Sequence, residues 1–307
     1  MVLSVVVLFG TGVWLPVAHA QGKQNFDAVK IEIQPVQGKV YMLTGAGGNV
    51  TVQAGPEGVL IVDTQFAPVA PKIVAAIRQL TDKPIRYIIN THVHGDHTGG
   101  NEALARAGQD VKIIAHENLL KAMSAPPTGR PQDYATARGN WPTETYTDRK
   151  TFDFNGEQIE LIHVEKAHST GDTIVFFHGS NVVSAGDIYA SSRYPSYDPQ
   201  GSIQGMITGL NRIIDMIQPP DKQGNGGTAL IPGHGRVTRQ PELVAYRDMS
   251  VTIRDRIQAL VNQGKTFEKV KAAQPVKEYE PVYGGNGGVS STDFVLEEIY
   301  KDLSGKK

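Results

Sequence analysis

Residues 90–100, with the sequence NTHVHGDHTGG, constrain the fold of this chain of 307 residues more than any other segment. They follow Ile85–Ile89, a short apolar run that is typical of a buried β-strand. Three imidazoles and a carboxylate fall within six residues: His92, His94, Asp96 and His97. These donors suit a borderline divalent cation such as Zn²⁺. The segment therefore predicts a metal site at the end of a strand.

The spacing within this segment favours two adjacent metal ions over one. His92 and His94 are two residues apart, so both rings point to the same side of an extended chain. Asp96 and His97 come after Gly95, where the chain can turn sharply into a helix. Their side chains can therefore face a different point from the first two histidines.

Three further candidate ligands lie downstream, each beside a glycine at or just after the end of an apolar strand. They are His168 in AHSTGD, Asp187 in SAGD and His234 in IPGHG. Any one of them alone would be read as a core or surface residue. Together with the first four they form a set of metal-type side chains at strand ends, where glycine lets the backbone approach a site closely. The chain has no cysteine, which excludes thiolate ligands, disulfides and a cysteine nucleophile.

The pattern of apolar residues predicts an α/β fold with two stacked sheets and helices on their outer faces. Strands are expected at 40–43, 50–53, 59–62, 85–89, 111–115, 151–154, 158–164, 173–177, 182–185 and 228–231. Helices are expected at 69–80, 98–106, 116–123, 203–217, 241–263, 267–273 and 291–303. Residues 124–150, which contain four prolines, are predicted to be a long loop. No linker divides residues 21–307, so we expect a single domain that ends in amphipathic helices.

Residues 1–20 have the composition of a secretory signal peptide. They contain no charged side chain and end in Ala18-His19-Ala20, a small-x-small pattern that precedes a polar segment. The usual positive residues at the start are missing, and a membrane anchor is the alternative. We expect the leader to be cleaved, and the mature protein to be periplasmic or secreted with no stable membrane insertion.

The balance of charge disfavours nucleic acid as a partner. The chain has 30 Lys and Arg residues against 31 Asp and Glu, a formal net charge of −1. A protein that grips a phosphate backbone needs an excess of positive charge. A small-molecule substrate is therefore the expected partner, and the oligomeric state stays open.

The motif HVHGDH, followed by His168, Asp187 and His234, resembles the metallo-β-lactamase superfamily over roughly residues 35–240. The resemblance implies a four-layer αβ/βα sandwich with the site at one edge of its two sheets. It also implies that His92, His94 and His168 bind a first zinc, that Asp96, His97 and His234 bind a second, and that Asp187 bridges both. The β-lactamases of this family that carry cysteine or serine in place of Asp187 differ from this chain. The bridging aspartate resembles that of hydroxyacylglutathione hydrolases and lactonases, so β-lactam cleavage is open but not implied.

This resemblance implies a dinuclear zinc hydrolase acting on a small ester, thioester, lactone or amide. A water held between two zinc ions loses a proton near neutral pH and becomes the nucleophile. Asp96 could orient that nucleophile through its second carboxylate oxygen. Tyr189 and Tyr194 are candidate donors to the developing oxyanion, with aromatic packing as an equally good interpretation.

Two other classes of function remain open at this point. One is a mononuclear iron persulfide dioxygenase on the same fold, and the other is a non-catalytic binding module. Metal analysis separates the first from a zinc hydrolase, and the complete ligand set disfavours the second. Outside the motif, Asp63 is a candidate hydrogen-bond partner for a ligating histidine, with a turn or helix cap as the alternative.

Overall fold

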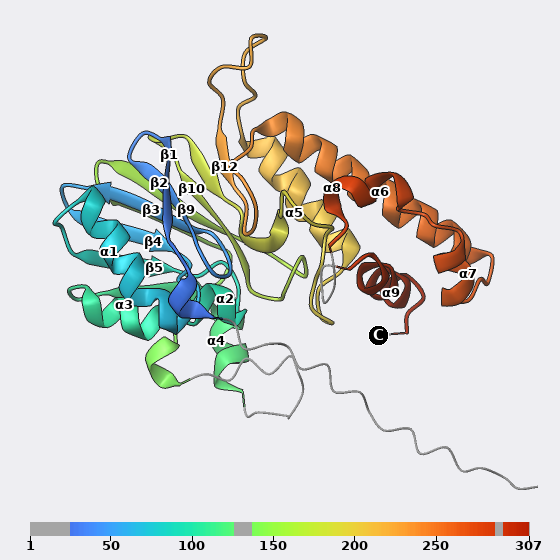
Figure 1. The fold of residues 1–307 in the computed structure, drawn as a ribbon, viewed down its shortest axis with the longest axis horizontal. Helices are drawn as coiled ribbons and strands as arrows, with labels where there is room; N and C mark the ends of the chain where they lie inside the picture. The colour runs from blue at the N-terminus through green and yellow to red at the C-terminus, as the bar shows by residue number, and fades with distance from the viewer. Residues whose placement is uncertain (1–24, 126–136, 286–290, 307) are drawn as a thin grey trace, which may run out of the picture.

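Two β-sheets packed face to face form the centre of the molecule (Figure 1). The computed structural model describes residues 25–125, 137–285 and 291–306. The predicted leader at 1–20 lies outside the described residues, as do Pro126, Pro127 and Pro131 of the predicted loop.

The first sheet has seven strands in the order β1-β2-β3-β4-β5-β6-β7. Neighbouring strands are antiparallel from β1 to β4 and parallel from β4 to β7. Their bounds are β1 Glu32–Gln37, β2 Val40–Thr44, β3 Val50–Gly55, β4 Gly58–Val62, β5 Ile85–Ile89, β6 Lys112–His116 and β7 Glu144–Tyr146.

The second sheet has five strands in the order β12-β11-β10-β9-β8. The pair β11–β12 is parallel and the other pairs are antiparallel. The bounds are β8 Arg149–Phe154, β9 Glu157–Val164, β10 Asp172–Phe177, β11 Val182–Ser184 and β12 Ala229–Ile231.

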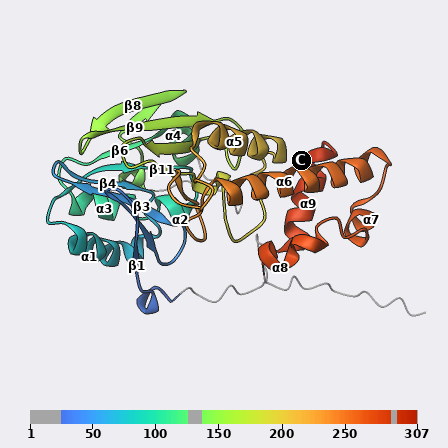
Figure 2. The same cartoon turned by 90° about the horizontal axis from the view of Figure 1, so that it is seen from above.

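Helices cover the outer face of each sheet, which completes the four layers (Figure 2). The helices are α1 Ala70–Leu80, α2 Gly95–Thr98, α3 Asn101–Ala107, α4 Glu117–Ser124, α5 Ile203–Met216, α6 Gln240–Asn262, α7 Phe267–Ala272, α8 Glu280–Tyr283 and α9 Thr292–Leu303. α1 and α3 pack on the first sheet and α5 packs on the second. α6 packs on α5, and α7 and α9 extend this last layer to one side. None of the helices in the described ranges combines the length and apolar character needed to cross a membrane.

The alternation of side chains along strand β4 shows how one strand serves two layers. Val59 and Ile61 point to the core beneath α1, whereas Leu60 and Val62 point to the core between the two sheets. All four are fully buried, so the strand reads as a continuous apolar run. This confirms the predicted αβ/βα sandwich.

The prediction of one long loop over residues 124–150 is wrong at its C-terminal end. β7 pairs in parallel with β6 through Ala115 and Thr145, and β8 already begins at Arg149. β7 has only three residues, too few to give a periodic signal in the sequence. Strand β1 was also not predicted, because none of its side chains is fully buried and it carries no clear apolar pattern.

Candidate metal centre

The candidate site lies where β5, β11 and β12 end, together with the loop that joins β9 to β10. After Ile89 the chain bends at residues 91–93, so it is not the continuous extended segment that the spacing of His92 and His94 predicts. His94 itself is extended and is the N-cap of α2. Asp187 lies in a short 3-10 helix, Gly186–Ile188, directly after β11. The structure brings together every predicted ligand: His92, His94, Asp96, His97, His168, Asp187 and His234.

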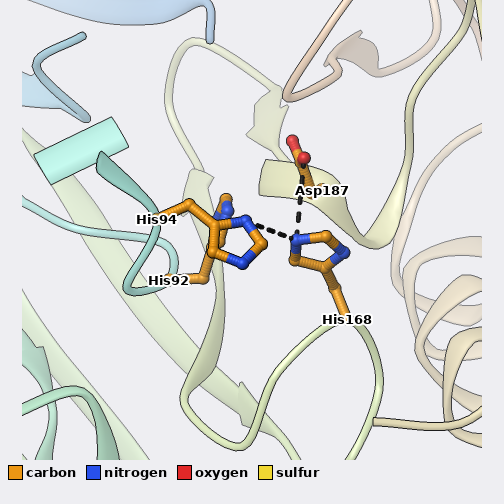
Figure 3. Close-up of side chains that lie close together, drawn as sticks. All are labelled: His92, His94, His168 and Asp187. Carbon is orange, nitrogen blue, oxygen red and sulfur yellow. Dashed lines mark hydrogen bonds and ion pairs between the residues drawn. The ribbon is translucent and has the colours of Figure 1, made fainter. Parts of the chain in front are cut away.

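The first group that could hold a metal ion consists of His92, His94, His168 and Asp187 (Figure 3). Nε2 of His168 lies 3.0 Å from Nδ1 of His94 and 3.7 Å from Oδ2 of Asp187. The ring of His92 lies edge-on to both other imidazoles, with centroids 4.7 and 4.6 Å away. This group matches the predicted first site.

The second group consists of Asp96, His97 and His234. Nε2 of His234 lies 3.2 Å from Nε2 of His97 and 3.2 Å from Oδ2 of Asp96. Oδ1 of Asp187 is 3.4 Å from Nε2 of His97, and its Oδ2 is 3.5 Å from Nε2 of His234. One carboxylate, that of Asp187, therefore faces both groups.

The opposite ring nitrogens of these histidines contact backbone or carboxylate oxygens. Nδ1 of His97 lies 2.7 Å from Oδ2 of Asp63, and Nδ1 of His168 lies 2.6 Å from the carbonyl oxygen of Ser196. Nε2 of His94 lies 3.0 Å from Oδ1 of Asp198. In each case the proton of a neutral ring belongs on the nitrogen that faces the oxygen, which leaves a lone pair on the nitrogen that faces the centre.

This arrangement of lone pairs fits a metal ion. When His94 and His168 are both neutral, two lone pairs face each other at 3.0 Å, an arrangement that a cation between them would stabilise. Burial would lower the pKa of His94, but its contact with Asp198 raises it, so without a metal ion a proton can take this place. Within the described residues, Nε2 of His92 and Oδ1 of Asp187 are buried and have no hydrogen-bond partner. Buried polar atoms without a partner are costly, and metal coordination would satisfy them. Zn²⁺ prefers imidazole nitrogen and carboxylate oxygen, which are the donors present.

Burial and mutual proximity keep two of the histidines neutral. Burial and the neighbouring His97 and His168 hold the pKa of His92 well below its ordinary value. Burial and the neighbouring His94 lower the pKa of His168. Neutral imidazole is the form that binds a metal, so these two rings are ready ligands.

Carboxylates have the opposite effect on His97. Burial alone would lower its pKa, but Asp187, Asp63 and Asp96 raise it to about 10. Burial would likewise raise the pKa of Asp187, but the surrounding histidines, with His97 first, hold it well below its usual range. A cation at the second group would take the place of the proton on His97.

Glycine permits a close approach to the centre at the turn between β2 and β3. A Cβ on Gly48 would lie 2.3 Å from Cε1 and 2.5 Å from Nε2 of His97. The backbone N–H of Gly48 donates to the carbonyl of Asp96, so this turn lies against the second group. By contrast, a Cβ on Gly95 would meet nothing within 4 Å, and its φ is not in the left-handed region. The turn into α2 therefore does not depend on glycine, contrary to the expectation for Gly95.

The structure does not place the two predicted oxyanion donors with the ligands. Tyr189 is 1% exposed and packs against Tyr246, with ring centroids 5.1 Å apart. The hydroxyl of Tyr194 donates to the carbonyl of Val276, 3.2 Å away in the C-terminal part of the chain. Both positions agree with the packing interpretation.

Sequence reasoning missed Ser196 and Asp198, which contact His168 and His94. They lie in the irregular segment between Ala190 and Ser202, where no periodic pattern or metal-type spacing marks them. Asp63, a candidate from the sequence, does contact His97, and it also accepts hydrogen bonds from the backbone and hydroxyl of Thr91. Asp63, His92 and His97 also form a third group whose donor atoms lie close enough together to hold a metal ion. Because the carboxylate of Asp63 already contacts Thr91 and Nδ1 of His97, we assign Asp63 as an outer partner and not as a ligand.

Comparison with known proteins identifies the family. Residues 43–235, more than half of the chain, match the family model of the metallo-beta-lactamase superfamily. The chain belongs to this superfamily. Among its relatives, the α subunit of 2,4-dinitroanisole O-demethylase from Nocardioides sp. (strain JS1661) is 30% identical over 149 residues. A linear primary-alkylsulfatase from Pseudomonas sp. (strain ATCC 19151) is 41% identical over 70 residues.

These matches cover only parts of each protein. The first spans 47% of this chain and 42% of the relative, and the second spans 21% and 13%. Among solved structures, the stereoselective inverting sec-alkylsulfatase Pisa1 from Pseudomonas sp. is similar with a TM-score of 0.63 and 16% identity. That likeness covers 88% of this chain and 50% of the sulfatase, and it supports the superfamily fold.

Proposed function

We propose that this chain is a dinuclear zinc-dependent hydrolase. The observation that carries the proposal is the position of Asp187 between the two groups. Its Oδ1 faces His97 of the second group. Its Oδ2 faces His168 of the first group and His234 of the second. A carboxylate has two oxygens and can bind two cations at once. Its negative charge also offsets the repulsion between two dications at short range.

The chain's own residues would hold the two ions in fixed places. His92, His94 and His168 would hold the first, and Asp96, His97 and His234 the second, with Asp187 between them. Such a pair of ions supplies an activated water near neutral pH and polarises the bond that is cut. Asp96 is the most exposed of the carboxylates at the centre, with 27% of its side chain accessible, so its second oxygen can orient a reacting group.

The substrate class we propose is a small ester, thioester, lactone or amide, which includes β-lactams. Hydrolysis of such a bond needs a nucleophile and stabilisation of charge on an oxygen, and a dinuclear centre provides both. A sulfate ester is the second candidate, because two of the similar proteins named above are alkylsulfatases. The similarity to Pisa1 extends over most of this chain, which favours including alkyl sulfates in a substrate screen.

A mononuclear iron persulfide dioxygenase is the competing function in a different class. It would need one metal and oxygen, whereas two ligand groups with a shared carboxylate favour two ions. Metal analysis of the purified protein, together with oxygen uptake, separates the two. Two zinc ions per chain without oxygen uptake support the hydrolase, and one iron with oxygen uptake excludes it.

The direct experiment is a screen of the zinc-loaded protein on lactones, thioesters, β-lactams and alkyl sulfates. We expect turnover of one of these classes and its loss when zinc is removed. Activity that survives complete removal of metal would overturn the proposal.

We also propose that the protein is exported, on the basis of the apolar leader at residues 1–20. Expression of the full chain in a bacterium, followed by fractionation and N-terminal sequencing, tests this proposal. A periplasmic product that begins near Gln21 supports it. A full-length product in the membrane fraction supports the anchor instead.

A further inference from the structure

The segment between Ala190 and Ser202 connects the metal centre to the C-terminal helices. It leaves the 3-10 helix that carries Asp187 and ends where α5 begins at Ile203. Ser196 and Asp198 contact the histidines, whereas Tyr194 and Tyr197 contact the C-terminal part of the chain. We call this segment the connecting loop.

On one side, the connecting loop holds two ligands of the first group. The carbonyl oxygen of Ser196 lies 2.6 Å from Nδ1 of His168, and Oδ1 of Asp198 lies 3.0 Å from Nε2 of His94. The backbone N–H of Asp198 also donates to the carbonyl of His168 at 2.7 Å. A shift of this loop would therefore turn both rings.

On the other side, a carboxylate of α9 holds the connecting loop. Oδ2 of Asp302 accepts a hydrogen bond from the hydroxyl of Tyr197 at 3.2 Å and from the backbone N–H of Ile203 at 2.9 Å. Tyr197 is 5% exposed and packs in the core beneath α5 and α6. The residue after Tyr197 is Asp198, so the anchor lies directly beside the contact to His94.

Electrostatics explains why an acidic residue stands at position 302: its carboxylate is stabilised by the start of α5 and not by its own helix, α9. Asp302 lies in the last turn of α9, where the helix dipole disfavours a negative charge. Its carboxylate instead contacts the first backbone N–H of α5, at the positive end of that helix. The hydrogen bond from the backbone N–H of Ile203 therefore favours an acidic residue at position 302. The same hydrogen bond fixes the start of α5 and the end of the connecting loop.

We propose that α9 positions the first metal site through Asp302 and Tyr197. The chain of contacts runs from Asp302 to Tyr197, through the adjoining backbone to Asp198 and Ser196, and from these to His94 and His168. Asp302 and Tyr197 are positioning residues, since neither belongs to a ligand group of the described residues. This inference rests on the proposed metal centre.

The test compares zinc affinity among four full-length variants. Asp302→Asn removes the charge of the anchor, and Tyr197→Phe removes one hydroxyl and keeps the ring. Asp198→Asn changes the direct partner of His94. The matched control is Asp293→Asn, which removes a charge from the same helix at an exposed ion pair with Lys271.

Each variant is stripped of metal and titrated with zinc against a chelator of known affinity. The absorption spectrum of the cobalt-substituted protein reports ligand geometry independently of activity. We expect Asp302→Asn to lose about tenfold in affinity at the tighter site, near the low end of the range for losing an outer partner of a ligand. Tyr197→Phe loses less, and Asp293→Asn binds zinc like the parent.

A double variant tests whether the residues act along one path. Asp302→Asn combined with Asp198→Asn should lose less affinity than the product of the two single losses, because both changes act on His94, whereas Asp302→Asn also acts on His168 through Ser196. Losses that multiply would place Asp302 outside the path and overturn the proposal.

The outcomes also separate this inference from the proposed function. If the parent protein binds no zinc, the metal centre itself is wrong. If the parent binds two zinc ions but Asp302→Asn and Tyr197→Phe match Asp293→Asn in affinity and cobalt spectrum, only the positioning role is wrong. Should Asp302→Asn not fold, Tyr197→Phe decides the question by the same comparison.

Discussion

Asp63 and His97 are joined by a fully buried contact of 2.7 Å between Oδ2 and Nδ1. Asp63 reaches this position with a backbone φ of 62°, a left-handed conformation that is uncommon for residues other than glycine, although aspartate adopts it more often than most. Its other oxygen accepts from the backbone N–H of Thr91 at 2.8 Å. The carboxylate thus ties the end of β4 to the ligand segment after β5 and fixes which nitrogen of His97 faces the centre.

Changing Asp63 should therefore weaken the second metal site. In Asp63→Asn, the side chain keeps one acceptor oxygen and cannot serve Thr91 and His97 as before. We expect zinc affinity at the second site to fall by about 10- to 100-fold, the usual effect of losing such a partner. Zinc titration of the metal-free protein measures it. Asp110→Asn is the matched control, since Asp110 also has a positive φ but is exposed. Equal affinity in both variants would contradict the role of Asp63.

The close approach of Gly48 to His97 predicts a steric effect at the same site. In Gly48→Ala, the new methyl group would overlap the ring of His97 at 2.3–2.8 Å, so the ring must move. We expect loss of the second zinc, with the first retained. Gly95→Ala, with open space around the new methyl group, should keep both. Zinc content after gel filtration checks the contrast, and the prediction is wrong if the two variants behave alike.

The fold was predictable where local sequence and burial agree. The strand β5 and the polar residues after it form one continuous signal, because three of its five residues are buried isoleucines and the metal-type side chains follow soon after the last of them. β7 could not be predicted, since three residues become a strand only through pairing with β6, which is distant in the sequence.

Some residues of the candidate site could likewise be predicted from the sequence, and others could not. Metal-type side chains at strand ends are visible as residue types, so the residues of the two groups that could hold a metal ion could be named in advance. That they bind metal stays a prediction. Asp198 and Ser196 could not be named in advance. Their contacts to His94 and His168 depend on how the chain folds, and no spacing in the sequence marks them. Tyr194 was named for its place near Asp187, but its hydroxyl contacts Val276.

Removal of metal should lower the melting temperature of the protein. The buried nitrogens and carboxylate of the centre would lose their shared cation, and an ion that binds only the native state stabilises it. We expect dialysis against a chelator to lower the melting temperature and zinc to restore it. Scanning calorimetry of both forms is the measurement. Identical melting curves with and without chelator would contradict a native metal site.

A pair of stacked histidines away from the metal centre predicts a dependence of stability on pH. The rings of His116 and His163 are parallel to within 5°, with centroids 3.5 Å apart. Burial, and in His116 also the neighbouring His163, lowers both pKa values below the ordinary value of about 6.5. The unfolded chain then binds more protons than the folded chain as the pH falls through this value, so stability decreases on acidification.

The variant His163→Phe tests this pair. It keeps a flat ring for stacking on His116 and removes one titrating group. We expect the melting temperature of the variant to fall less between pH 7 and pH 5 than that of the parent. Because the metal centre is the same in both proteins, the difference between the two curves isolates the pair. Parallel curves would show that it does not contribute.

Asp187 allows the sharpest test of the whole site. Its side chain is 7% exposed, lies against Gly233, and faces both ligand groups. In Asp187→Ala, the three histidines of the first group remain, whereas the second group loses a shared oxygen and a charge that offsets two dications. We expect a folded protein that holds one zinc instead of two.

Turnover should fall with the second zinc, by about 100-fold or more, in the range that altered metal ligation commonly costs. Asp187→Asn is the matched variant, because it keeps the volume and one acceptor oxygen but not the charge. It should bind the second zinc more tightly than Asp187→Ala and more weakly than the parent. The asparagine keeps one oxygen that can bind zinc, but it lacks the negative charge that attracts the ion. Zinc stoichiometry by elemental analysis, measured beside kcat on the substrate from the screen, checks both. Two zinc ions and near-normal kcat in Asp187→Ala would mean that Asp187 does not bridge the site.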